Sequence, residues 1–161
     1  MAKPIVSVLF VCLGNICRSP SAHGVFQQVL EKAGAADRVR VDSCGTGDFH
    51  IGKAPDQRAI AAARKRNIDI DSLRARQFEP ADLKQFDYIL VMDRHNLENI
   101  RDIWHRYGGT QPELFLGYGQ SHDVDEVPDP YYGGEQGFER VLDLIEDASQ
   151  GLLRDIRERH F

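Results

Sequence analysis

The sequence predicts an α/β fold of three layers, in which a central, mostly four-stranded parallel sheet is flanked by helices. Short apolar runs rich in β-branched residues alternate with longer segments of helical spacing, which is the pattern of parallel strands joined by helical crossovers. The length of 161 residues, with 42% hydrophobic and 28% charged residues, suits one globular domain spanning residues 1–161. We find no internal repeat and no low-complexity tract.

The first half of the chain contains two predicted strands and two predicted helices. Residues 5–11 form an apolar run typical of a strand buried on both faces. Ser19-Pro20 then predicts an N-cap followed by proline at the first helical position, and Gly34 ends this helix. A second strand, a loop punctuated by Gly and Pro, and a second helix are predicted at residues 39–43, 45–55 and 56–66.

The second half predicts two more strands and two more helices. Residues 86–92 form the third strand, and Asp93 caps a helix that reaches Tyr107. The chain then predicts a short strand at 113–116, a long loop at 117–137 and a C-terminal helix from 138 to 156, with a candidate break near Gly151. A loop of that length inside a compact domain is usually functional or disordered.

Charge and cysteine content exclude several classes of protein. The 20 Lys and Arg residues against 25 Asp and Glu give a net charge of -5, which argues against general nucleic-acid binding and against adhesion to anionic membranes. No apolar run approaches the roughly 20 residues needed to span a bilayer, and the first residues do not resemble a signal peptide. The three cysteines, an odd number in a chain of this length, do not suggest a set of structural disulfides. We therefore expect a cytoplasmic protein with reduced thiols.

The most informative segment is the loop between the first predicted strand and the first predicted helix, residues 12–18 (CLGNICR). Open α/β sheets bind ligands at such loops, and a helix N-terminus directs backbone N–H groups at a bound oxyanion. Gly14 permits a tight backbone path, and Arg18 adds a planar fork for two phosphate oxygens. Cys12 lies where the same positive field favours thiolate over thiol. The segment therefore predicts a phosphate-binding loop that contains a nucleophile.

Each part of this pattern is weak when taken alone. A lone cysteine at the end of a buried strand is usually a small core residue, and Cys-x5-Arg also occurs by chance. The conjunction is more specific, because a strand, Cys-x5-Arg-Ser, a glycine and a Ser-Pro helix start follow one another.

Residues 8–20 (VLFVCLGNICRSP) resemble the signature of the low-molecular-weight protein tyrosine phosphatases. Further motifs of that family follow in the same order at residues 43–46 (SCGT), 75–77 (ARQ) and 129–132 (DPYY). The resemblance extends over nearly the whole chain. It implies hydrolysis of phosphotyrosine monoesters through a phosphocysteine intermediate, with no cofactor and no metal.

The resemblance also implies roles for single residues of the loop. Cys12 would attack phosphorus, Arg18 would bind the phosphate, and Ser19 would donate a hydrogen bond to the thiolate. Asn15 would hold the backbone of the loop through a network that reaches Ser43, and Asn is among the few non-glycine residues that tolerate positive φ. The phosphate oxygens would be bound by the loop formed by Leu13, Gly14, Asn15, Ile16, Cys17 and Arg18.

By the same resemblance, Asp129 is the general acid that protonates the leaving tyrosyl oxygen and then the base that activates water. From residue type alone, Asp129 competes with Asp123, Asp125 and Glu126 in the same loop, and Asp-Pro is often only a turn. The match to the family selects Asp129.

Three aromatic residues are candidates for the walls of the cleft. Phe49, Tyr131 and Tyr132 would contact a phenyl phosphate through their rings, although Tyr132 also suits packing of its own loop. Leu73 departs from the family, since many relatives carry a histidine there, two residues before the motif at 75–77. Phe49 stands where some relatives have Trp, which would alter substrate preference.

Other functions remain open at this point. Cys12 and Cys17 suggest a metal site, but no second cysteine pair exists and the six histidines are scattered. Arsenate reductases of the same fold need a further cysteine pair, and no cysteine follows Cys44. Arginine phosphatases of this fold tend to carry Thr in place of Ile16. A module that only binds phosphotyrosine would need no nucleophile and acid together.

Two expectations concern partners and regulation. The partner would be a tyrosine-phosphorylated protein, and bacterial relatives often act on tyrosine kinases. Cys17 lies five positions after Cys12 in a loop that surrounds one anion, so a disulfide between them could protect an oxidised nucleophile.

Overall fold

The sheet has the predicted parallel topology. The computed structural model describes residues 5–130 and 134–161. Four parallel strands form one sheet in the order β2-β1-β3-β4, and they are β1 (Val6–Cys12), β2 (Val39–Gly45), β3 (Tyr88–Val91) and β4 (Pro112–Leu114). Because β1 lies between β2 and β3, the chain that leaves β1 is flanked by the carboxyl ends of both neighbours.

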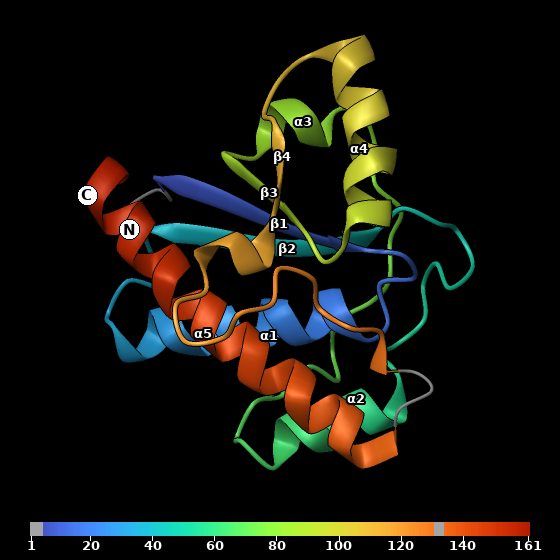
Figure 1. Ribbon diagram of the computed structural model, residues 1–161, viewed down its shortest axis with the longest axis vertical. Coiled ribbons are helices and arrows are strands. Elements are labelled where there is room, and N and C mark those ends of the chain that lie inside the picture. The colour runs from blue at the N-terminus through green and yellow to red at the C-terminus, as the bar shows by residue number, and fades with distance from the viewer. Residues whose placement is uncertain (1–4, 131–133) are drawn as a thin grey trace.

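Helices cover both faces of the sheet (Figure 1). One face is covered by α1 (Arg18–Lys32) and α5 (Gly134–His160), and the other by α3 (Asp82–Gln85) and α4 (Arg94–Tyr107). Helix α2 (Gln57–Arg64) packs against α1 and α5 on the side away from the sheet. A 3-10 helix, η1 (Phe115–Tyr118), follows β4 and packs against α5. No helix in the described ranges is long and apolar enough to cross a membrane.

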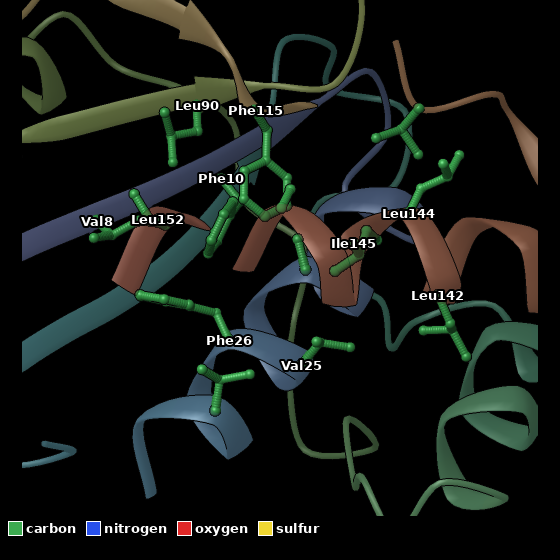
Figure 2. Close-up of a cluster of buried hydrophobic side chains, with 14 of the residues drawn as sticks. Val8, Phe10, Val25, Phe26, Leu90, Phe115, Leu142, Leu144, Ile145 and Leu152 are labelled. Carbon is green, nitrogen blue, oxygen red and sulfur yellow. The ribbon is translucent and has the colours of Figure 1, made fainter. Parts of the chain in front are cut away.

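Strand β1 is buried on both sides, as its continuous apolar run predicts. On one face, Phe10 contacts the rings of Phe26 and Phe115 edge to face, with centroids 5.9 Å and 4.8 Å apart (Figure 2). On the other face, Leu9 and Val11 join a smaller apolar cluster beneath α4. This burial fixes the end of β1, from which the loop at 12–18 begins.

The start of α1 differs from the prediction. The helix begins at Arg18, and Cys17 rather than Ser19 occupies the N-cap position, with no side-chain capping bond. Ser19 lies inside the first turn because its hydroxyl is used elsewhere, against the sulfur of Cys12. The cap that the sequence predicts is thus replaced by a contact inside the loop.

The C-terminal helix also differs. Helix α5 starts at Gly134 and continues through Gly151 without a break. A Cβ atom at Gly151 would lie 1.8 Å from the carbonyl oxygen of Tyr118, so glycine is needed there for the close approach of η1 and not to end the helix.

One smaller element has other bounds than predicted, and another was not predicted at all. Strand β4 ends at Leu114, and the residues after it turn into η1, which buries Phe115 in the core. The four-residue helix α3 was not predicted, because a single turn gives no periodic signal.

Candidate active site

The loop at residues 12–18 curls tightly between β1 and α1. Asn15 has φ 58°, the left-handed conformation, which Asn tolerates better than most side chains. Gly45, at the end of β2, lies directly against the loop: a Cβ atom there would come within 2.6 Å of the Leu13 carbonyl oxygen. Backbone bonds from Thr46 to Cys12 (2.8 Å) and from Gly47 to Leu13 (2.9 Å) hold the loop to this strand end.

Cys12 lies at the floor of the loop, and the residue is only 3% exposed. Its sulfur has two hydrogen-bonding neighbours. It receives the backbone N–H of Asn15 at 3.2 Å and lies 2.9 Å from the hydroxyl oxygen of Ser19. The Ser19 oxygen also accepts a bond from the Asn15 side-chain amide at 2.8 Å. The one hydrogen of the Ser19 hydroxyl has two acceptors in reach, the Cys12 sulfur at 2.9 Å and the Cys44 carbonyl at 3.3 Å. Directed at the nearer sulfur, it stabilises a thiolate.

Arg18 is buried beside the sulfur and oriented by two acceptors. Its guanidinium donates to the Asp93 carboxylate at 2.7 Å and to the Val127 carbonyl at 3.0 Å. Burial opposes the charge of this guanidinium, but the Cys12 sulfur and the Asp93 carboxylate outweigh it and raise the pKa of Arg18 above its ordinary value. Arg18 is therefore a permanent, fixed cation at the loop, as phosphate binding requires.

The second cysteine of the loop has a different environment. Burial, followed by the nearby Asp56 and Cys12, raises the pKa of Cys17 to about 12. Cys17 is therefore a neutral thiol at physiological pH, although it lines the same pocket as Cys12.

A network behind the loop holds Asn15 in place. The backbone N–H of Arg76 donates to the Asn15 side-chain oxygen at 3.0 Å. The Arg76 guanidinium is in turn held by Asp42 and the buried Asp82, each at 3.0 Å. These contacts give the motif at residues 75–77 a structural role behind the loop. The backbone of the motif also forms an isolated parallel bridge with Gly45.

Ser43 is not a direct partner of Asn15 among the hydrogen bonds of the described residues. The amide of Asn15 bonds to Ser19 and Arg76, whereas the Ser43 hydroxyl pairs with the ring Nδ1 of His23 at 3.2 Å. The next residue of β2 is Cys44, whose carbonyl is the second acceptor within reach of the Ser19 hydroxyl.

Leu73, the departure from the family, packs against the apolar core. An imidazole nevertheless contacts Ser43, because His23 projects from α1. Burial lowers the pKa of His23, with Asp42 opposing the effect, so His23 is mainly neutral at pH 7.

Six of the predicted loop residues line one pocket of about 200 Å³ together with three residues from other segments, while Asn15 and Ser19 are not among its walls. Its walls are Cys12, Leu13, Gly14, Ile16, Cys17, Arg18, Phe49, His50 and Asp129. Phe49 is 67% exposed, so its ring is available to an incoming group. Tyr131 and Tyr132 lie outside the described residues, and their predicted place at the cleft remains a prediction.

The structure separates the four acidic candidates of the long loop. Asp125 and Glu126 form ion pairs with Arg94, at the start of α4. Asp129 lines the pocket that contains Cys12, and Asp123 does not. Asp129 is thus the acidic side chain of this loop that can reach a group bound over the sulfur.

Sequence reasoning missed two residues of the site. His50 lines the pocket, and a Cβ atom on Gly14 would lie 3.0 Å from its ring; no pattern in the sequence pointed to it. Asp93 was predicted as a helix cap, which it is, since it accepts the backbone N–H of Asn96 at 2.8 Å. Its second oxygen orients Arg18. Because both residues follow parallel strands that are neighbours in the sheet, a correct strand order would have predicted that they lie close together.

We find no group of three or more potential metal-ligating side chains in residues 5–130 and 134–161.

A buried sulfur at the floor of an anion loop, a fixed arginine and a carboxylate in one pocket define a cysteine-dependent phosphate monoesterase. The model of the low molecular weight phosphotyrosine protein phosphatase family matches residues 7–160. The chain belongs to this family. It is a protein-tyrosine phosphatase, a hydrolase with a cysteine-based mechanism into which Cys12 and Arg18 fit.

Relatives from distant organisms support this assignment. The low molecular weight phosphotyrosine protein phosphatase of Schizosaccharomyces pombe is 43% identical over 94% of this chain and 97% of its own. The crystal structure of YfkJ from Bacillus subtilis has a TM-score of 0.90 with 38% identity, covering 98% of both chains. A protein tyrosine phosphatase from Entamoeba histolytica, solved with Hepes in the active site, also has a TM-score of 0.90, with 38% identity and coverage of 95% of this chain and 97% of its own.

Proposed function

We propose that Cys12 attacks the phosphorus of phosphotyrosine while Asp129 protonates the departing oxygen. The Sγ–P bond forms as the bond from phosphorus to the tyrosyl oxygen breaks, and the proton of Asp129 passes to that oxygen. Arg18 and the backbone amides of the loop hold the phosphate oxygens. The observation that carries this proposal is that Cys12, Arg18 and Asp129 line one pocket.

The second half of the reaction reverses the roles of the same groups. The Asp129 carboxylate takes a proton from water, the water oxygen bonds to phosphorus, and the Sγ–P bond breaks. The sulfur leaves as a thiolate, which the Ser19 hydroxyl (2.9 Å) and the Asn15 N–H (3.2 Å) stabilise. Free phosphate and Cys12 in its starting state are the products.

The apolar part of the pocket supports a phenyl ring as the group that carries the phosphate. Leu13 and Ile16 of the loop, with Phe49, give the pocket its apolar walls, and aromatic contacts add about 0.5–1.5 kcal/mol beyond the area they bury. A phosphotyrosine side chain offers such a ring, whereas a phosphorylated guanidinium would place polar N–H groups against Ile16.

The test compares three variants without added metal. Cys12→Ser should hydrolyse p-nitrophenyl phosphate at no detectable rate, because the other thiol of the pocket, Cys17, is neutral and does not replace the thiolate. Asp129→Asn should lower kcat/KM for phosphotyrosine by about 10²–10⁴-fold, while inorganic phosphate still inhibits competitively. Asp123→Asn, an exposed acid of the same loop, should keep native activity.

Two outcomes would contradict the assignment. Substantial turnover by Cys12→Ser would exclude the covalent mechanism. An equal loss for Asp129→Asn on phosphotyrosine and on an aryl phosphate with a strongly acidic phenol would reassign Asp129 to a structural role. A burst of released phenol from the native protein distinguishes an enzyme from a module that only binds phosphotyrosine.

We propose further that the physiological partner is a tyrosine-phosphorylated cytoplasmic protein such as a bacterial tyrosine kinase. Three unpaired cysteines support a reducing compartment. A Cys12→Ser, Asp129→Ala variant should retain a phosphorylated partner, so capture followed by elution with inorganic phosphate tests the proposal. Recovery of proteins without phosphotyrosine would contradict it.

A further inference from the structure

One short segment contacts both the phosphate-binding arginine and the loop that carries the acid. This segment is Met92–Arg94, the junction of β3 and α4. The Met92 carbonyl accepts the backbone N–H of Val127 at 2.7 Å, and the Val127 carbonyl accepts a bond from Arg18 at 3.0 Å. Val127 is buried and lies two residues before Asp129, so the loop is fixed at one point close to the acid.

Arg94 supplies a second attachment to the same loop. Its two terminal nitrogens contact both oxygens of the Asp125 carboxylate, one of them at 3.1 Å. Its backbone N–H donates to a Glu126 oxygen at 2.7 Å, and its guanidinium lies 3.6 Å from the other. A cation in the first turn of a helix opposes the helix dipole, and these two carboxylates offset that unfavourable position.

The rest of the loop has few attachments among the described residues. Asp147 on α5 accepts the backbone N–H groups of Gln120 and Ser121, and residues 121–125 are exposed. Asp129 itself is exposed and forms interactions of its own. The pairing at Arg94 therefore restricts the chain immediately before Val127 and Asp129.

We propose that Arg94 is a positioning residue for the general acid, and that it holds the loop through Asp125 and Glu126 so that Asp129 stays over the pocket. This inference rests on the role of Asp129 proposed above. A general acid acts only within hydrogen-bond reach of the leaving oxygen, and a displacement of about 1 Å can cost two orders of magnitude in rate. The side chains of Arg94 and Asp125 are 56% and 54% exposed, so the attachment weakens as salt is added.

The first experiment compares Arg94→Gln with Arg101→Gln, an exposed arginine two turns along α4. We expect Arg94→Gln to lower kcat/KM for phosphotyrosine by roughly threefold to tenfold, the effect of two exposed ion pairs. The same variant should keep its kcat/KM for dinitrophenyl phosphate, whose leaving group needs no proton. Arg101→Gln should resemble the native protein on both substrates.

The dependence of activity on ionic strength distinguishes a positioning role of Arg94 from a purely structural one. Raising KCl from roughly 0.05 M to 0.5 M shortens the screening length to a few ångströms. The ratio of kcat/KM for phosphotyrosine to that for dinitrophenyl phosphate should fall in the native protein and in Arg101→Gln. In Arg94→Gln the ratio should be low at the start and nearly independent of salt.

The Asp129→Asn background separates this inference from the proposed function. There, Arg94→Gln should cause no further loss on phosphotyrosine, because the group that it positions is gone. Equal losses on both substrates, or an undiminished loss in the Asp129→Asn background, would overturn the role of Arg94 alone. If Asp129→Asn itself shows no dependence on the leaving group, the general-acid assignment fails and the inference about Arg94 fails with it.

Discussion

Replacing Ser19 with alanine should slow the release of the thiolate more than any earlier step. The hydroxyl lies 2.9 Å from the Cys12 sulfur, and a hydrogen bond to a charged group contributes about 1.5–3 kcal/mol. When the phosphocysteine is hydrolysed, the sulfur regains its charge, so the full contribution is lost at that step. The expected decrease in the hydrolysis rate is roughly 10- to 150-fold.

Stopped-flow measurement with p-nitrophenyl phosphate resolves the two steps. Ser19→Ala should release about one equivalent of nitrophenol rapidly and then turn over slowly, as expected when an acyl- or phospho-enzyme accumulates. The variant should also lose about 1–3 kcal/mol of stability, because the buried amide of Asn15 loses its acceptor. Ser21→Ala is the matched control, since this buried hydroxyl donates at 2.7 Å to the Cys17 carbonyl and not to the sulfur.

Two results would refute this reasoning. A native steady-state rate in Ser19→Ala would show that the contact does not assist the leaving thiolate. If the burst and the steady state slow by the same factor, Ser19 acts on the shape of the loop rather than on the charge of the sulfur.

Gly151→Ala should destabilise the protein by about 1–3 kcal/mol in urea unfolding, because the added carbon would lie 1.8 Å from the Tyr118 carbonyl oxygen; unchanged stability would contradict this packing. Burial lowers the pKa of His23 below its ordinary 6.5, so stability should fall as pH drops below about 6.5, and His23→Asn should reduce that fall. Peroxide should inactivate the native enzyme reversibly, because Cys17 lines the same pocket as Cys12 and can trap the oxidised sulfur as a disulfide with loss of water; the raised pKa of Cys17, about 12, should make this closure slow, since the thiolate is the attacking form. Intact mass after peroxide should show that disulfide, and Cys17→Ser should recover poorly with a thiol reductant.

The regular elements of the fold were largely accessible from the sequence. The apolar run at residues 5–11 identified β1, and Asp93 correctly marked the start of α4. These signals are local, since strand burial and helix capping depend on neighbouring residues. The start of α1 was wrong because a tertiary contact, Ser19 with Cys12, replaced the local cap.

The loop that holds phosphate was predictable in composition but not in its supports. Cys-x5-Arg after a strand indicated the loop, and Asn15 suited a left-handed backbone. The partners of Asn15 and Arg18 come from residues 61 and 109 positions away, and no spacing rule reaches so far. The same limit explains why the contact between Ser43 and His23 was not foreseen.

The long-range supports of the loop also have a consequence for synthesis of the chain. Cys12 is made early, but the residue that fixes Arg18 through its carbonyl, Val127, is made 109 positions after Arg18, and Asp129 follows it. During translation, Cys12 is therefore synthesised long before the residues that complete its active site. A nascent or partly folded chain has a thiol but no assembled phosphatase, so catalytic activity is itself a measure of the completed fold.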